Sequence, residues 1–511
     1  MYLKKSKNSS GRIYLSIVHS YRENGKSKSK TVKGIGYVDE LEKEYDDPIE
    51  HFTQVVSQME AKRRAQQIPT LMKISPQEEI SQDGAIKNLG FCALSKIYHS
   101  LNIDLFAEAY VVRNKLSYNL DSTLQMLTYE QILSSADTEA VSYTENFFFE
   151  NFKNPADYSE LSRSDVAQLS LALQHHLQAV LAKSHEKNDD IVYLNLIDHF
   201  HEGTSETSSS EAKSDKKSNP PAFRAVVLSD KKHLPISYAV FPNTSAKKKE
   251  VVTAFAHDIQ TKETGRMIIL SGSDIDAKDK VCLLTKKRGG YLHLLPPALQ
   301  TPEIKQWVLS SQDYLSKKDG TKIKSRLVSK TLKASSKHES IKITEKQVAV
   351  YSPKHAYHNR RGGENLSSSN DEMNNYFVIV TSETWKTDID IRNIFLHNSE
   401  VIDFFRSPEK ISDVTHPDLM NENYAKAYFL VSFLAATILC LLKSKINNVY
   451  SITEIATSLR SANGFHLEEN WWMFTSYNDV LAQLSKVTDI DFSKKYLRKS
   501  DIDQIIRQTK R

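Results

Sequence analysis

The chain has 511 residues, of which 40% are hydrophobic and 26% are charged, a balance typical of folded globular proteins rather than disordered or fibrous ones. Its 68 basic and 63 acidic residues give a net charge of only +5, so overall charge does not by itself indicate a nucleic-acid ligand. Three widely separated cysteines without CxxC spacing argue against a disulfide framework and a zinc site, namely Cys92, Cys282 and Cys440.

The length predicts about three domains, at roughly 150 residues for each. The first predicted element is a basic β-hairpin, in which residues 12–18 and 31–36 form the arms and Asn24-Gly25 forms the turn. Lysines and arginines occupy both arms: Lys4, Lys5, Lys7, Arg12, Arg22, Lys26, Lys28, Lys30 and Lys33. They fit either an edge hairpin kept soluble by charge or a strand pair resting on phosphates, and both explanations remain open.

Residues 85–183 have a helical pattern. One apolar stripe begins behind a possible cap at Ser164 and consists of Val166, Leu169, Leu173, Leu177, Val180 and Leu181. His175 and His176 interrupt it, but adjacent helical residues point about 100° apart. They therefore cannot hold one metal together, and we predict that they are structural.

From residue 190 the pattern changes to strands, predicted at 190–200, 223–228, 236–241, 266–270 and 376–381, with helices near 250–261 and 277–287. Residues 203–219 form a polar, low-complexity loop. Residues 427–442 are apolar but shorter than the ~20 residues that span a bilayer, so a buried helix is expected rather than a membrane segment. Because no secretory signal is visible at the N-terminus, a cytoplasmic protein is expected.

Residues 313–363 are strongly basic and carry interleaved tyrosines, which favours a phosphate-contacting surface over a merely solvated face. The residues expected to contact DNA are Lys4, Lys5, Arg12, Arg22, Lys28 and Lys30 in the hairpin, and Lys322, Lys324, Arg326, Arg360 and Arg361 in the later segment.

Several short phrases point to one family. They lie at 14–18, 20–22, 33–37 and 41–49, and then at 234–238 with 241–242, 266–270 and 377–382. In these phrases and their order, nearly the whole chain resembles bacterial insertion-sequence transposases of the DDE type. The resemblance implies an α/β fold: an RNase H-like mixed sheet flanked by helices, interrupted by a basic β-rich insertion and preceded by a β-hairpin and a helical domain.

The implied domains are a basic β-hairpin and linker at 1–75 and a helical DNA-binding or dimerisation region at 76–187. The RNase H-like core is expected in two parts, 188–290 and 373–450. The basic insertion is expected at 291–372 and a helical tail at 451–511.

In that family two aspartates and a glutamate hold two divalent cations that activate the attacking oxygen and stabilise the leaving oxygen. By resemblance these positions are Asn195, Gly272 and Ile402 here. An amide offers one weak neutral oxygen, and the other two side chains offer no ligand. The tyrosine, arginine and lysine that surround the glutamate are replaced by Phe395, Asn398 and Glu409.

Three nearby aspartates are possible displaced ligands: Asp198, Asp274 and Asp403. Asp198 falls on the opposite face of an extended strand from Asn195, and Asp403 is rotated about 100° from Ile402 on a helix. One remaining carboxylate does not hold two metals, so the acidic triad is predicted to be degenerate.

The sequence therefore favours a catalytically inactive, transposase-like protein that binds double-stranded DNA, with no cofactor or metal. By resemblance it is expected to form homo-oligomers and to associate with the bacterial nucleoid. No membrane contact is expected. The alternative is an active transposase that cuts and transfers DNA strands with Mg²⁺ held by displaced ligands. A weaker alternative is a protein-interaction module whose basic insert is only a solvated face.

Overall fold

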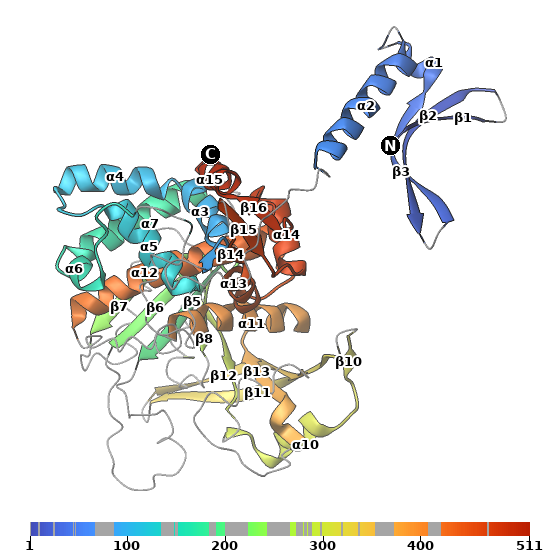
Figure 1. The fold of residues 1–511 in the computed structure, drawn as a ribbon. Helices are drawn as coiled ribbons and strands as arrows, with labels where there is room; N and C mark the ends of the chain where they lie inside the picture. Colours follow the sequence, from blue (N-terminus) through green and yellow to red (C-terminus); the bar gives the residue numbers. More distant parts are fainter. Residues whose placement is uncertain are drawn as a thin grey trace, which may run out of the picture. The chain divides into compact units, whose positions relative to one another are not determined.

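The fold is taken from a computed structural model, which describes residues 2–8, 11–23, 26–43, 45, 47–66, 86–133, 148, 152–182, 191–199, 223–242, 266–271, 280, 284, 289–296, 299–317, 320–335, 338–352, 372–406, 421–467 and 470–510. The chain divides into two units, Met1–Glu79 and Ile80–Arg511 (Figure 1). The boundary lies in a stretch, 67–85, that is outside the described residues.

The first unit is a three-stranded antiparallel sheet followed by two helices. Its strands are β1 (Tyr2–Lys7), β2 (Ile13–Glu23) and β3 (Lys26–Tyr37), and its helices are α1 (Val38–Leu41) and α2 (Pro48–Gln66). The predicted hairpin is confirmed as β2 and β3. Strand β1 was not predicted; it pairs along the free edge of β2, and its three lysines are exposed while Leu3 and Ser6 are half-buried.

The second unit is built on a nine-stranded mixed sheet in the order β10-β11-β12-β13-β9-β8-β5-β6-β7. Strands β5 (Ile191–His199), β6 (Phe223–Ser229) and β7 (Pro235–Pro242) form an antiparallel meander. Strands β8 (Arg266–Ser271) and β9 (Gly289–Leu294) then add in parallel to β5. The strands predicted at 190–200, 223–228, 236–241, 266–270 and 376–381 are confirmed, and the coarse fold is mixed α/β.

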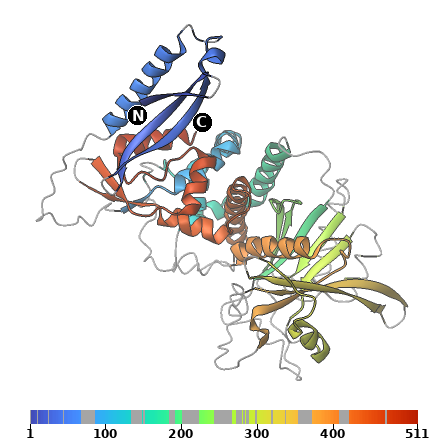
Figure 2. The ribbon, with the colours of Figure 1, turned by 90° about the vertical axis from the view of Figure 1, so that its right-hand side faces the viewer.

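The other half of this sheet contains the predicted basic insertion. Strand β13 (Tyr376–Thr381) pairs antiparallel with β9 and carries β12 (His338–Tyr351), β11 (Lys322–Ser335) and the short β10 (Leu315–Ser316). A short helix, α10 (Pro302–Leu309), and a 3-10 turn, η5 (Glu372–Asn375), flank these strands. The long β11–β12 ribbon is seen most clearly in Figure 2.

Alternation along β5 divides its side chains between two packed faces. Val192 and Leu194 belong to one apolar cluster, while Tyr193 and Ile197 pack on the other face toward helices. Of the helices predicted beside this sheet, 250–261 lies outside the described residues, and only residues 280 and 284 of 277–287 are described, both helical.

A helical region surrounds one long buried helix, α12 (Glu422–Lys445), which contacts α3 (Phe91–Ser100), α5 (Leu120–Leu133), α6 (Tyr158–Ser162), α7 (Val166–Ala182) and α11 (Asp388–Arg406). Among the described residues, α12 is the one helix long and apolar enough to cross a membrane. However, 83% of its most apolar window is buried in the fold. The predicted buried helix at 427–442 is confirmed.

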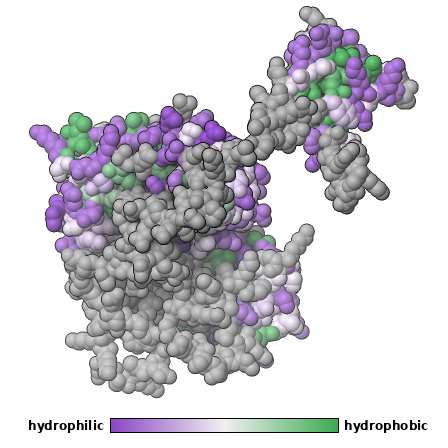
Figure 3. Space-filling view, viewed as in Figure 1, coloured by the Kyte–Doolittle hydropathy of each residue, from purple (hydrophilic) through white to green (hydrophobic). Residues whose placement is uncertain are grey.

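The apolar stripe of α7 is buried as predicted except for Val180, which is half-buried. The cap of α7 is Asp165 rather than Ser164. The Asp165 carboxylate accepts the backbone N–H of Gln168 at 3.0 Å, while the Ser164 hydroxyl donates to the Leu161 carbonyl. Helix α4 (Ile103–Asn114) lies at the surface and exposes Leu105 and Val112. Figure 3 shows a small apolar area at the upper left, the part of the view in which Figure 1 draws α4.

The predicted helical tail at 451–511 contains α13 (Ile452–Ser461), α14 (Asp479–Thr488) and α15 (Lys499–Gln508), but strands as well. Strands β14 (Asn463–His466), β15 (Trp471–Phe474) and β16 (Tyr496–Arg498) form a sheet with β4 (Ile86–Asn88). This pairing joins residues such as Asn88 and Asn463, which are far apart in the sequence, and local periodicity does not reveal such a contact.

Candidate functional site

The first predicted triad position, Asn195, lies in the middle of β5 on the face covered by α11. It is fully buried, and its backbone aligns with Leu270 near the carboxyl end of the parallel strand β8. In open α/β sheets, ligands bind at the carboxyl ends of parallel strands. Asn195 therefore occupies the part of the sheet where a core of this kind would act.

The α11 side chain that faces Asn195 is Asn398. The Asn195 amide nitrogen donates to the Asn398 side-chain oxygen at 3.0 Å, and Asn398 in turn donates to the Ile394 carbonyl at 2.8 Å. The side-chain oxygen of Asn195 is buried and has no hydrogen-bond partner among the described residues. The strand and the helix are thus joined through two uncharged amides.

His233 completes this cluster from the turn between β6 and β7. Its Nδ1 lies 2.9 Å from the Asn398 amide nitrogen, and its ring stacks on Tyr193 with centroids 5.0 Å apart. The turn holds His233 at a φ of 65°, with the Asp230 carboxylate accepting the backbone N–H groups of Lys232 and Leu234. We call Asn195, Asn398 and His233 the amide cluster.

The histidines at this place are held neutral. Burial, together with the neighbouring His397, lowers the pKa of His233 to about 3. Burial, together with the positive charge of Lys443, likewise lowers the pKa of His397 to about 4. Asn195, Asn398 and the two histidines are therefore uncharged at neutral pH.

The remaining predicted positions contribute no described ligand beside Asn195. Ile402 is 8% exposed and packs in the apolar core with Ile197. Asp198 lies on β5 and Asp403 on α11, but their side chains are outside the described residues, as are Gly272 and Asp274 entirely.

A pair of magnesium ions would need several oxygen ligands beside Asn195. Hard divalent cations require several oxygen ligands, usually carboxylates. In the Asn195–Asn398 pair one neutral side-chain oxygen is free, that of Asn195, because the Asn398 oxygen already accepts a hydrogen bond. Within the described part of the chain, no group of three His, Cys, Asp or Glu side chains could hold a metal. Asn195 and Asn398 by themselves therefore do not fit a pair of cations, and the possible displaced ligands Asp198, Asp274 and Asp403 lie outside the described side chains.

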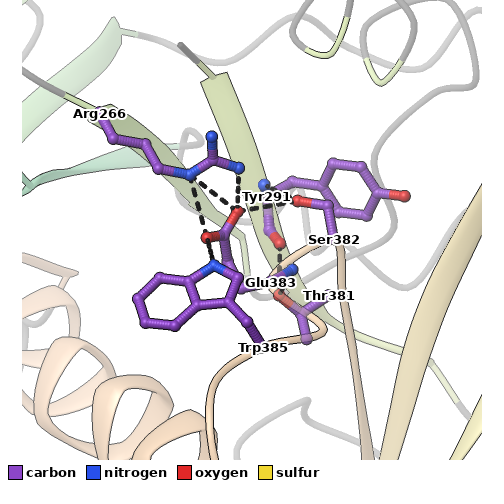
Figure 4. Close-up of polar contacts among 6 residues, drawn as sticks. All are labelled: Arg266, Tyr291, Thr381, Ser382, Glu383 and Trp385. Atoms are coloured by element: carbon purple, nitrogen blue, oxygen red, sulfur yellow. Dashed lines mark hydrogen bonds and ion pairs between the residues drawn. The ribbon is translucent and has the colours of Figure 1, made fainter. Parts of the chain in front are cut away.

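A buried charged cluster lies at the opposite end of the same parallel strands. Glu383 is 1% exposed and accepts from Arg266 at 2.5–3.2 Å and from the Trp385 indole at 3.0 Å (Figure 4). Arg266 begins β8, and Glu383 follows the end of β13. Because the cluster is at the amino ends of β8 and β9, we assign it a structural role in joining the two halves of the sheet.

The insertion carries a second buried charge. Glu345 of β12 is fully buried, pairs with Lys280 and Lys330, and accepts a hydrogen bond from Tyr291 at 2.7 Å. Burial alone would raise the pKa of Glu345, but the two lysines and the tyrosine hold it below its ordinary value. The Lys330 ammonium therefore has an ion-pair partner within the β11–β12 ribbon.

The predicted DNA contacts of the insertion differ in accessibility. Lys322 is exposed, with its ammonium 5.6 Å from the Tyr351 ring centroid. Lys324 is 3% exposed and donates to the carbonyls of Trp307, Ser310 and Gln312, and Arg326 stacks on Trp307 at 4.3 Å. Arg360 and Arg361 lie outside the described residues. Lys324 is thus occupied within the chain.

In the N-terminal sheet, Lys4, Lys5 and Lys30 are exposed, while Arg12 forms ion pairs with Asp39 and Glu40 at 2.6 Å each. Its hydrogen bond lowers the pKa of Asp39. The backbones of Arg22 and Lys28 lie on β2 and β3, but their side chains are outside the described residues. Among the described side chains of the three strands, every charged group is basic.

Sequence reasoning missed the part that His233 plays, and it treated Asn398 only as a replaced arginine. The turn signal of Asp230 was available, but nothing local indicates that this turn reaches α11. The prediction that His175 and His176 are structural agrees with the contacts of His176, which bonds the Leu101 carbonyl at 2.9 Å and packs on Phe106.

Comparison with protein families identifies a match in the N-terminal part of the chain. Residues 3–71 match the family described as the N-terminal domain of IS1634 family transposases. A search of curated proteins found no match. The matched residues span the three strands and both helices of the first unit. The match supports a transposase-derived protein of the insertion-sequence kind.

Proposed function

We propose that this chain is a DNA-binding protein derived from a DDE-type insertion-sequence transposase, with an RNase H-like core that does not cut DNA. The mixed sheet, flanked by helices and extended by a basic β-ribbon, supports an RNase H-like core with an insertion. The family match of residues 3–71 supports the transposase origin.

The observation that carries the loss of cleavage is the amide cluster. An aspartate at position 195 would bring a negative charge and two acceptor oxygens to the middle of β5, whereas Asn195 brings one neutral oxygen. Its N–H group donates to Asn398 at 3.0 Å, so the facing helix supplies an acceptor for an amide rather than a second carboxylate. Metal-assisted strand cleavage needs both charge and geometry at this place.

The observation that supports DNA binding is the one-sided charge of the N-terminal sheet. Phosphate contacts by lysines release condensed counterions, so binding should weaken steeply as salt rises. Electrophoretic mobility shift of a labelled duplex at increasing salt tests this. Lys4→Glu with Lys5→Glu should lower affinity and flatten the salt dependence, whereas the matched pair Lys494→Glu with Lys495→Glu should not. Absence of any shift at low salt would defeat the proposal.

Cleavage is tested with plasmid DNA that carries the gene's own flanking sequences, incubated with Mg²⁺ or Mn²⁺. The expected result is intact DNA under conditions in which the protein binds. Cleavage that Asp274→Ala abolishes would instead establish an active transposase with a displaced ligand.

We also propose self-association and a place on the bacterial nucleoid, both of which rest on the resemblance. Sedimentation velocity of the full chain, with and without duplex, tests self-association directly. A monomer at all concentrations and with DNA would contradict it.

A further inference from the structure

One face of the N-terminal sheet gathers aromatic and small residues. Along β2 and β3, Tyr14 lies opposite Tyr37 and Ser16 lies opposite Gly34, so these side chains share a face. Leu15 lies opposite Gly36 on the other face, where a side chain at Gly36 would meet Leu41 of α1. Helix α1 therefore packs on the face opposite the tyrosines.

Tyr14 is held in place by its neighbours. Its hydroxyl lies directly over Gly34, where an added Cβ would come within 2.7 Å of that oxygen. The Tyr14 and Tyr37 rings meet edge to face at 5.1 Å, and the guanidinium of Arg12 covers Tyr37 at 4.1 Å. Gly34 is needed here for the space that it leaves under the ring.

This arrangement leaves aromatic surface in solvent. Tyr14 is 36% exposed, and Tyr2, which the β1–β2 pairing places on the same face, is 46% exposed. Lys4 lies on this face as well, opposite Ser16, whereas the exposed Lys5, Lys7, Lys30 and Lys33 pair with β2 positions that point to the other face of the sheet. Exposed tyrosine rings that share a face with the Lys4 ammonium suit a ligand with both a flat apolar group and negative charge.

We propose that this face binds an unpaired nucleotide of DNA, with its base stacked on Tyr14 and its phosphates near Lys4. The inference rests on the proposed DNA binding and adds the kind of DNA. A paired base offers only its edge in a groove, whereas an unpaired base offers its flat face to an aromatic side chain. Stacking on aromatic rings within a positively charged surface is how sheets hold single strands.

The test compares two fluorescent DNAs by anisotropy with the full-length protein: a blunt duplex, and the same duplex with an unpaired thymidine tail. Wild-type protein should bind the tailed DNA more tightly by about tenfold, the scale of one stacked base. Tyr14→Ala should remove this preference and leave blunt binding unchanged. Tyr14→Trp, which keeps a flat ring, should retain it.

The matched control is Tyr496→Ala, which removes a tyrosine that is 44% exposed on β16 in the other unit and should change nothing. Thermal melting of each variant checks folding, and if Tyr14→Ala is unfolded, the comparison of Tyr14→Leu with Tyr14→Trp decides. Equal binding of both DNAs by wild type and Tyr14 variants would overturn the inference while leaving DNA binding intact. Binding of neither DNA at low salt would overturn both.

Discussion

The Glu383 cluster allows a prediction of stability that can be worked out from its contacts. The perturbation is Glu383→Gln, which keeps the size of the side chain but removes its charge and one acceptor oxygen. The carboxylate receives hydrogen bonds from Arg266, Trp385 and Ser382 on two oxygens. A glutamine amide would turn its own N–H₂ group toward one of these donors.

The magnitude follows from burial. Breaking a fully buried ion pair by removing one partner costs about 3–5 kcal/mol. Here the Glu383 side chain is 1% exposed but that of Arg266 is 32% exposed, so water can solvate part of the stranded guanidinium. We therefore expect a loss of about 2–3 kcal/mol in the free energy of unfolding, below the fully buried range.

The assay is urea unfolding followed by tryptophan fluorescence, with Glu303→Gln on the exposed face of α10 as the matched control. A double-mutant cycle with Arg266→Gln isolates the coupling between the two side chains. Both single variants lying within about 0.5 kcal/mol of wild type would refute the structural role assigned to this pair.

Three further predictions concern other parts of the second unit. Wild type should lose stability as pH falls from about 6.5 toward about 3, because the folded state lowers the pKa of His233 and the unfolded state takes up the proton first. His233→Asn should make this loss smaller. Equal pH profiles of the two proteins in thermal melting would contradict the prediction. Lys324→Met should lower stability by roughly 1–3 kcal/mol by leaving backbone carbonyls unpaired, with DNA affinity unchanged in the same preparation; a selective loss of affinity would show that the lysine contacts DNA. Gly90→Ala should lower the free energy of unfolding by roughly 1–3 kcal/mol, since the added Cβ would overlap the Leu459 carbonyl. An unchanged free energy of unfolding would mean that α3 and α13 can move apart without loss of stability.

Local patterns predicted the elements well. Alternation located β2, β5 and the other core strands, and the apolar stripe located α7, because both signals arise within a few consecutive residues. The cap of α7 was misplaced by one residue, since Ser164 and Asp165 are both good caps and only the geometry selects Asp165.

Contacts between distant segments were not predictable in the same way. The sequence indicated that Asn195 and Ile402 stand where carboxylates are expected, but not that Asn398 is the α11 residue beside Asn195. Nor did the basic count of the insertion distinguish exposed Lys322 from buried Lys324. Burial of a lysine depends on what crosses over it, here α10, and composition carries no such information.

The position of α12 has a consequence for how the polypeptide matures on the ribosome. Helices α3, α5 and α7 complete their packing only against α12, and α7 ends at Ala182 while α12 ends at Lys445. At roughly 5–20 residues per second, the nascent helices wait on the order of 10–50 s for this partner. During that interval the apolar faces of these helices are accessible to chaperones. Translation products that end before α12 should therefore be prone to proteolysis.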